Sequence, residues 1–176
     1  SSEELKLFQE SYKERNKIIE NFEEVYPMNG IELGMIFYTL KSLKEYAKDQ
    51  EVIYHEQSLL DLPYKGFDFE MFKRAVKLMT DKHAGLRKIY DLENFAHIIL
   101  KVVNPEINFV DISHLDKPSQ DRFIKEEQYK RRQKRRDMSF SLLWQMLIIK
   151  ISDSYQYLLF DFHHSLLDGW SLQTFI

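Results

Sequence analysis

The chain has 176 residues, 44% of them hydrophobic and 14% aromatic, a composition that predicts a globular fold with a sizeable core rather than a disordered chain. The formal net charge of −3 excludes a global basic field that would recruit nucleic acid. Because cysteine is absent and no apolar run reaches the ~18 residues of a membrane span, we expect a cytoplasmic protein without disulfides, thiol catalysis or a membrane partner.

The first predicted elements are two helices. Residues 3–21 carry apolar side chains at spacings near three and four among charges, which predicts an amphipathic helix that packs or links rather than one that recognises a ligand. The proline of Tyr26-Pro27 disfavours helical backbone at the residue before it and ends this helix. A second helix then runs to about residue 47.

The second helix carries a start signal and an unusual glycine. Asn29 is its predicted N-cap, and Glu32, three residues later, is the capping-box partner. Gly34 lies inside the helix, where glycine costs about 1 kcal/mol relative to alanine. We therefore expect Gly34 to allow the close approach of another backbone.

A strand and a third helix are predicted next. Residues 51–62 form the strand, after which Pro63 and Gly66 turn the chain. Asp68 is the predicted cap of a helix over residues 69–83.

Shorter strands follow the third helix. A strand begins at residues 88–90, residues 91–94 form a turn, and residues 95–103 return as the second strand of a hairpin. We expect residues 107–112 to form a short edge strand.

A charged helix is predicted over residues 120–136, after Pro118 and Ser119. Six of its last seven residues, 130–136, are cations, and this run has three interpretations: a phosphate-binding patch, a contribution to docking an acidic carrier protein, or a solvated helix end. We favour the solvated end, because cations suit the negative pole of the helix dipole and nothing aromatic interleaves them.

Two long apolar strands close the predicted fold, over residues 141–151 and 155–162, joined by a turn at residues 152–154. Helices and strands mix with several local hairpins. The predicted class is therefore α/β or α+β with a mixed sheet.

Two histidines follow the last strand. If the strand continues to His164, the side chains of His163 and His164 face opposite sides, so one is packed and the other presented. This argues against a metal site, because such a site needs at least three convergent ligands. It favours a single imidazole that exchanges a proton near neutral pH. Asp168 would either orient that imidazole or pair with an arginine, and Gly169 suits a turn with positive φ.

Three segments carry a family resemblance. Residues 163–171, His-His-x-x-x-Asp-Gly-Trp-Ser, resemble the core motif of condensation domains of nonribosomal peptide synthetases, which also occurs in epimerisation domains and, more loosely, in chloramphenicol acetyltransferase. Residues 26–37 resemble the family's first motif, a Tyr-Pro-Leu-x-x-x-Gln-x-Gly-Met-Leu-Phe run, and residues 81–87 its second, Asp-Arg-His-x-x-Leu-Arg. The resemblance covers the chain from about Phe22 to its last residue.

The resemblance implies a fold and a domain organisation. The implied fold is an α/β (α+β) sandwich, a chloramphenicol acetyltransferase-like lobe with a mixed β-sheet flanked by helices. Residues 1–21 would be a linker from a preceding module, and residues 22–176 the N-terminal lobe of a condensation domain whose second lobe is absent. The chain stops within an apolar, helix-like pattern at residues 171–176, which also leads us to expect the first part of a larger protein.

The resemblance also implies a reaction. The amine of an acceptor aminoacyl group attacks the thioester of a donor acyl group, and a peptide bond forms. The implied partners are the donor and acceptor peptidyl carrier proteins and the C-terminal lobe of the same domain. The phosphopantetheine arms belong to the carriers, so no cofactor needs to be bound directly and no metal is expected.

The roles of individual residues follow from the same resemblance. His164 matches the active-site histidine, and His163 is structural. Asp168 matches an aspartate that pairs with an arginine at the position of Arg87, and Gly169 lets the turn approach the thioester or the arm. The other motif positions near the substrate tunnel are Tyr26, Gly34, Met35, His83, Trp170 and Ser171.

The chain departs from the family pattern in three places. Glu32 stands where glutamine is usual, and Lys82 where arginine is usual. The family often has Pro-Leu-x-Arg at the opening of the strand before the core motif, where residues 142–145 read Leu-Leu-Trp-Gln. These departures bear on local packing and substrate preference.

Two alternative functions are compatible with these residues. An epimerisation domain has the same fold and would use the second histidine at Cα, together with a glutamate of the second lobe. A non-catalytic module would bind carrier proteins only. The presence of His164 and Asp168 favours a catalytic domain, although the chain by itself is expected to be inactive.

Overall fold

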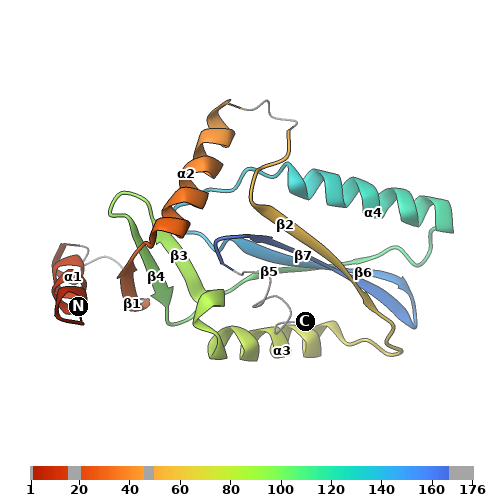
Figure 1. Ribbon diagram of the computed structural model, residues 1–176. Coiled ribbons are helices and arrows are strands. Elements are labelled where there is room, and N and C mark those ends of the chain that lie inside the picture. The colour runs from red at the N-terminus through yellow and green to blue at the C-terminus, as the bar shows by residue number, and fades with distance from the viewer. Residues whose placement is uncertain (1, 16–20, 46–49, 167–176) are drawn as a thin grey trace.

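The computed structural model describes residues 2–15, 21–45 and 50–166 (Figure 1). Its helices are α1 (Ser2–Arg15), α2 (Gly30–Glu45), α3 (Phe69–Lys82) and α4 (Lys117–Arg132), and a 3₁₀ turn covers Ala84–Arg87. Its strands are β1 (Phe22–Pro27), β2 (His55–Leu62), β3 (Lys88–Asp91), β4 (Ala96–Leu100), β5 (Glu106–Asp111), β6 (Trp144–Ser152) and β7 (Tyr155–His163).

The described strands form two sheets. One is antiparallel in the order β1-β4-β3, and the other is mixed in the order β2-β7-β6-β5. In the second sheet β2, β7 and β6 are antiparallel neighbours, and β5 runs parallel to β6 at the edge. The mixed sheet flanked by helices confirms the predicted fold class. The division into two sheets was not predicted.

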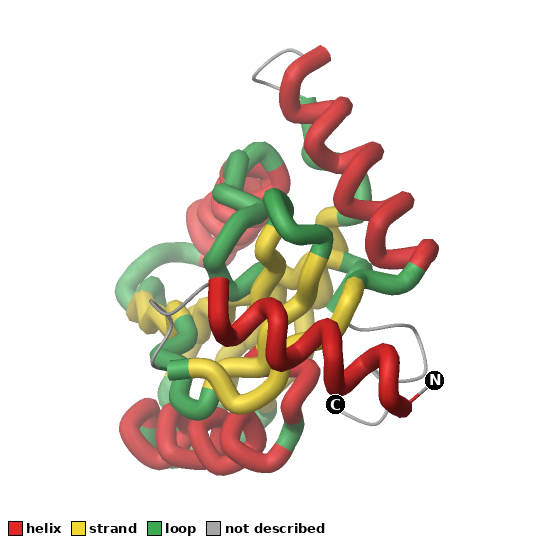
Figure 2. The backbone as a smooth tube through the Cα atoms, turned by 90° about the vertical axis from the view of Figure 1, so that its left-hand side faces the viewer, coloured by secondary structure: helices red, strands yellow, loops and turns green. Residues whose placement is uncertain are grey.

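Helices lie on both faces of the four-stranded sheet (Figures 1 and 2). Alternate side chains of β6 and β7 explain this, because both faces of these strands are apolar and each needs a cover. On one face, Leu147, Ile149 and Leu159 pack with Ile124 of α4. On the other face, Met146 and Phe160 belong to a larger core that includes residues of α2 and α3.

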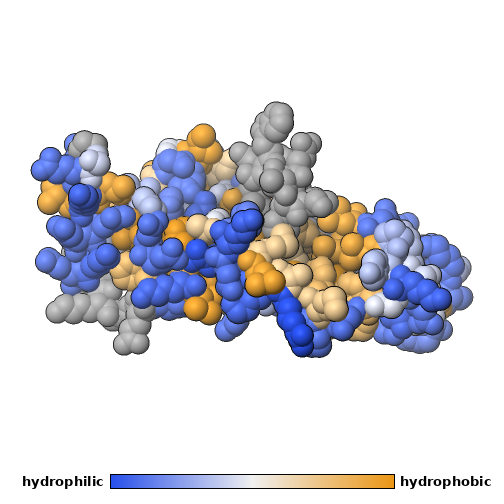
Figure 3. Space-filling view, turned by 90° about the horizontal axis from the view of Figure 1, so that it is seen from below, coloured by the Kyte–Doolittle hydropathy of each residue, from blue (hydrophilic) through white to orange (hydrophobic). Residues whose placement is uncertain are grey.

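A groove of about 480 Å³ opens between α3 and the sheet. Phe72 and Met79 of α3 line one wall, and Leu60, Leu158 and other apolar residues of the sheet line the other. Figure 3 views the molecule from the side of α3 and shows apolar side chains gathered on this face.

The predicted start signals of α2 and α3 are confirmed. Asn29 Oδ1 accepts hydrogen bonds from the backbone N–H of Ile31 and of Glu32, and Glu32 Oε2 accepts one from the N–H of Asn29, which completes the capping box. Asp68 accepts from the N–H of Met71 at the start of α3.

The charged helix begins and ends earlier than predicted. Asp116 is its N-cap and Pro118 lies within its first turn, where the missing N–H of proline has no intrahelical partner to lose. It ends at Arg132, so four residues of the predicted helix belong to the following loop.

The N-terminal part differs more from the prediction. The described part of the first helix covers Ser2–Arg15, and Tyr26-Pro27 ends a strand, β1, rather than a helix. The helix packs on this strand, where Gln9 Nε2 donates to Val25 C=O at 2.9 Å. It also reaches β3 through Tyr12, which is 1% exposed and whose hydroxyl donates to Asp91 at 2.5 Å. Residues 16–20, within the predicted helix, lie outside the described residues.

The expected role of Gly34 is wrong for the described structure. A Cβ built on Gly34 meets nothing within 4 Å, so no other described backbone approaches this position closely.

Candidate active site

The two histidines sit at the end of β7 and differ in exposure. His163 is 6% exposed, whereas 37% of the His164 side chain is exposed. Backbone hydrogen bonds hold both residues, from His163 N–H to Leu143 C=O at 2.8 Å and from His164 N–H to Tyr54 C=O at 2.9 Å. The structure therefore buries one histidine and leaves the other partly exposed, as predicted. The predicted reason, strand alternation, does not apply, because β7 ends at His163 and His164 lies in the turn that follows. Their chemical roles stay predictions.

The buried imidazole of His163 is neutral. Its Nδ1 lies 3.2 Å from the N–H of Ser165, a group that can only donate, so Nδ1 is the acceptor and the proton sits on Nε2. Nε2 then donates to Thr39 Oγ1 at 2.9 Å, and the Thr39 hydroxyl donates to Met35 C=O. Burial lowers the pKa of His163 to about 4, with further lowering from nearby positive charge.

The presented imidazole of His164 has a carboxylate beside it. His164 Nδ1 lies 3.9 Å from Glu56 Oε1, and the Glu56 side chain is 51% exposed. This separation is beyond hydrogen-bond distance, so at most a weak, solvent-screened attraction links the two groups. The residues around His164 therefore fix its backbone more firmly than its ring.

The backbone carbonyl of Ser165, one residue after His164, is held by a group that we call the Lys88 cluster: Glu32, Lys88, Tyr90, His97 and that carbonyl. Lys88 Nζ donates to Glu32 Oε1 at 2.8 Å and to Ser165 C=O at 3.0 Å. The Tyr90 hydroxyl has one proton to donate, and the same carbonyl, at 3.2 Å, is a nearer acceptor than Glu32 Oε1 at 3.4 Å. The cluster thus joins the first turn of α2 and strand β3 to the segment that follows the histidines.

Glu32 is the anion of this cluster. It is 5% exposed, and burial alone would raise the pKa of its carboxyl group. Hydrogen bonds from His97 Nδ1 at 3.1 Å and from Lys88 outweigh that effect and lower the pKa to about 2. A charged carboxylate therefore stands where the family usually has a neutral glutamine.

A second buried carboxylate lies on β7, two residues before His163. We call its surroundings the Asp161 cluster. Asp161 is 1% exposed and accepts four hydrogen bonds, from His55, Gln57, Arg131 and Gln145, at 2.7–3.1 Å. Burial raises the pKa of Asp161, but its hydrogen-bonding partners outweigh this and lower it.

Sequence reasoning did not identify the Asp161 cluster. An aspartate inside an apolar strand was the available signal, because a charge in such a place needs a partner. Gln145 stands where the family often has an arginine, and the guanidinium that reaches Asp161 comes from Arg131 of α4.

The interpretation of residues 130–136 as a solvated helix end is therefore wrong in part. Arg131 is 8% exposed and pairs with Asp161. Arg132 contacts Gln57 and Glu51, and the Arg135 guanidinium donates to a backbone carbonyl of α2. Most of these cations hold α4 and the loop after it to the rest of the molecule.

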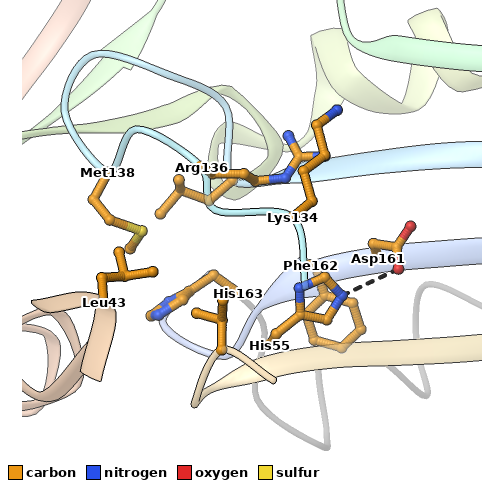
Figure 4. Close-up of a pocket in the computed structure, with 10 residues that line it drawn as sticks. Leu43, His55, Lys134, Arg136, Met138, Asp161, Phe162 and His163 are labelled. Atoms are coloured by element: carbon orange, nitrogen blue, oxygen red, sulfur yellow. Dashed lines mark hydrogen bonds and ion pairs between the residues drawn. The ribbon is translucent and has the colours of Figure 1, made fainter. Parts of the chain in front are cut away.

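A small cavity lies beside His163 (Figure 4). Its volume is about 20 Å³, enough for about one water molecule. Figure 4 shows His55 directed at Asp161 on one side and the loop with Arg136 and Met138 on the other. The size excludes this cavity as a substrate tunnel.

Arg87, the predicted partner of Asp168, is buried. Its guanidinium donates to the carboxylate of Glu23 and to the carbonyls of Thr80 and Leu100. Asp168 lies outside the described residues, together with Gly169, Trp170 and Ser171, so the Asp168–Arg87 pair stays a prediction.

The other predicted motif residues are dispersed. Tyr26 packs its ring 5.4 Å from that of His97, and Met35 accepts a hydrogen bond from Thr39. His83 is exposed and ends α3, where its N–H donates to Met79 C=O. Tyr26 thus touches His97 of the Lys88 cluster, and Met35 is bonded to Thr39, which is bonded to His163.

Two kinds of feature are absent from the described part of the chain. No three His, Cys, Asp or Glu side chains converge there as a metal site. None of its helices is both long enough and apolar enough to span a membrane.

Solved structures share this fold. The chain superposes on the starter condensation domain of rhizomide synthetase RzmA with a TM-score of 0.68 and 11% identity, covering 84% of this chain and 36% of that one. Holo-AB3403, a four-domain nonribosomal peptide synthetase, gives a TM-score of 0.68 and 16% identity, covering 86% of this chain and 11% of that one.

Curated relatives are large synthetases. Bacitracin synthase 3 of Bacillus licheniformis is 31% identical over 156 residues, and a linear gramicidin synthase of Brevibacillus parabrevis is 28% identical over 166 residues. These matches cover 85% and 93% of this chain but only 2% of each relative. A family model described as "Condensation domain" matches residues 23–176. The chain therefore belongs to the condensation-domain family of nonribosomal peptide synthetases.

Proposed function

We propose that residues 22–176 form the N-terminal lobe of a domain that makes a peptide bond between two carrier-bound substrates, with His164 at its centre. The observation that carries this proposal is the presentation of the His164 imidazole at the end of β7, next to a buried and neutral His163. Membership of the condensation-domain family supports the reaction type.

The chemistry requires one proton acceptor. The nitrogen of the acceptor amine attacks the carbonyl carbon of the donor thioester, a C–N bond forms, and the C–S bond breaks. The amine loses a proton, and the leaving sulfur gains one. A neutral imidazole within hydrogen-bond distance of the amine can take up the first proton. The half-buried His164 ring is free of a strong hydrogen bond to Glu56, so it is available for this transfer.

Alignment contributes alongside proton transfer. General base catalysis typically contributes 10²–10⁴-fold, and orienting two bound reactants can contribute at least as much. The backbone hydrogen bonds at His163 and His164, and the cluster around Ser165, would hold the imidazole in one place while the substrates arrive.

The substrates and partners follow from the same proposal. Donor and acceptor peptidyl carrier proteins would deliver their groups on phosphopantetheine arms, so the chain itself would bind no cofactor. The C-terminal lobe of the domain would complete the tunnel, and the chain alone would be inactive. Arg87 and Asp168 would pair to fix the loop after the histidines, and Gly169 would let that loop approach the arm.

The test uses the full-length protein that contains this chain. Donor and acceptor carriers are loaded with a defined aminoacyl pair, and dipeptidyl-carrier is followed by intact-protein mass spectrometry. We expect His164→Ala to lower the rate at least 10²-fold. The matched control is His114→Ala, because His114 is exposed and lies in the loop before α4.

Each other outcome contradicts part of the proposal. Equal rates in wild type and His164→Ala would remove His164 from the mechanism. Inversion at the donor Cα without a peptide bond would indicate an epimerisation domain. Carrier binding with neither reaction would indicate a non-catalytic module.

A further inference from the structure

Glu32 introduces a charge into the interior that a glutamine would not. A buried carboxylate is costly unless it is paired and hydrogen-bonded. Lys88 meets that need at 2.8 Å, and its own side chain is only 13% exposed. His97 and the N–H of Asn29 use the other carboxylate oxygen, Oε2. The Lys88 ammonium is thus held in place from α2.

The same ammonium makes a second contact that the ion pair does not require. It donates to the carbonyl of Ser165 at 3.0 Å, and the Tyr90 hydroxyl donates to that carbonyl at 3.2 Å. A carbonyl oxygen has two lone pairs, so these two donors saturate it. The Ser165 side chain is held separately, because its hydroxyl lies 2.7 Å from His163 Nδ1.

We propose that Lys88, anchored by Glu32, is a positioning residue for His164 that acts through the carbonyl of Ser165. The inference rests on the proposed function of His164. Tyr54 holds the backbone on the N-terminal side of His164, and Lys88 with Tyr90 holds it on the C-terminal side. The His164 ring has no strong hydrogen bond of its own among the described residues, so the position of the imidazole depends on the backbone that carries it.

The expected effect is on turnover rather than on substrate binding. A catalytic side chain has to be held within about 0.5 Å of its productive position. The Lys88 side chain is 13% exposed, and its ammonium donates to Glu32 and to Ser165. Both hydrogen bonds are to the protein, so we do not expect Lys88 to bind a substrate. Its loss should lower kcat and leave KM nearly unchanged.

The decisive variant is Lys88→Met in the full-length protein, because methionine keeps the length of the side chain and removes its donors. We expect kcat for dipeptide formation to fall about 10–100-fold, with KM within about 2-fold of wild type. Lys88→Arg keeps a charged donor and should recover part of the loss. The matched control is Lys77→Met, since Lys77 is 54% exposed and pairs with Asp81 of the same helix.

A second readout does not depend on activity. Diethyl pyrocarbonate modifies accessible imidazoles, and peptide mass spectrometry resolves the rate at each histidine. In Lys88→Met we expect the rate at His164 to change at least 3-fold while that at the remote His114 does not. If the wild type forms no peptide bond, the proposed function fails, and the modification rates still decide whether Lys88 positions His164.

Two results would overturn the proposal. One is a folded Lys88→Met protein with wild-type kcat and wild-type modification of His164. If Lys88→Met does not fold, Tyr90→Phe takes its place as the test variant, because this change removes one donor to Ser165 and keeps the aromatic ring. We expect Tyr90→Phe to lower kcat about 2–10-fold and to change the modification of His164, and wild-type values of both would exclude positioning through this carbonyl.

Discussion

Two buried carboxylates, Asp161 and Glu32, lie near the histidine pair. They differ in which other parts of the molecule their hydrogen-bonding partners contact. The described hydrogen bonds to the Asp161 carboxylate come from side chains of β2, α4 and β6, so the Asp161 cluster ties these elements to β7. Glu32 binds Lys88, which also reaches the backbone next to His164. The first arrangement serves the assembly of the sheet and α4, and the second extends to the candidate active site.

Burial alone therefore does not reveal a functional role. Asp161 is 1% exposed and Glu32 is 5% exposed, and both carboxyl groups have a lowered pKa. The two differ in what the paired cation binds besides the carboxylate. Lys88, the partner of Glu32, also donates to the carbonyl of Ser165 next to His164, whereas no such hydrogen bond is described for Arg131, the partner of Asp161. We expect changes at Asp161 to act mainly on stability and changes at Lys88 mainly on turnover.

The largest effect on stability is expected for Asp161→Asn. This change removes the nearer of the two counterions of the buried Arg131, at 2.9 Å, and leaves only Glu127 at 3.5 Å. Removing one partner of a buried ion pair typically costs about 3–5 kcal/mol. Native-state hydrogen exchange of β6 and β7 in the full-length protein measures the loss as faster opening of these strands. The control is Asp153→Asn in the turn between the same strands, where the side chain is 95% exposed. A loss below about 1 kcal/mol would contradict the assembly role of this cluster.

His163 and Glu32 should lose their contributions to stability at different pH values as the solution is acidified. The pKa of His163 is about 4 when folded and 6.5 when unfolded, so its contribution is complete above pH 6.5 and is lost as the pH falls toward 4, by about 3 kcal/mol. The pKa of Glu32 is about 2 against 4.5, so its contribution is lost only below pH 4.5.

Hydrogen exchange at pH 7 and at pH 4.5, corrected for the intrinsic exchange rate, checks this order. We expect the end of β7 to lose protection over that range in the wild type and to lose much less in His163→Gln. Equal losses in the two proteins would show that another group titrates there.

The smallest effect is expected for Lys134→Ala. Lys134 pairs with Glu106 at 3.2 Å, but the two side chains are 46% and 44% exposed, and such pairs contribute about 0–1 kcal/mol. Exchange at β5 should change by less than this amount. A larger loss would mean that the basic run beyond α4 is as important to assembly as Arg131.

Local signals in the sequence predicted the parts of the site that depend on near neighbours. The capping box of Asn29 and Glu32 and the difference in exposure between His163 and His164 are both present in the structure. Other local expectations failed where a partner from elsewhere decided the outcome. Residues 22–27 became a strand because β4 pairs with them, and Arg131 became buried because Asp161 faces it.

Short-range patterns in the chain were enough to specify the family and the caps of α2 and α3, because motifs and capping are set by residues a few positions apart. Which cations meet the buried carboxylates depended instead on tertiary packing. Lys88 reaches Ser165 across 77 positions, and Arg131 reaches Asp161 across 30. Contacts at such separations depend on the order of strands in the sheets and on how helices pack against them, which no local pattern specifies.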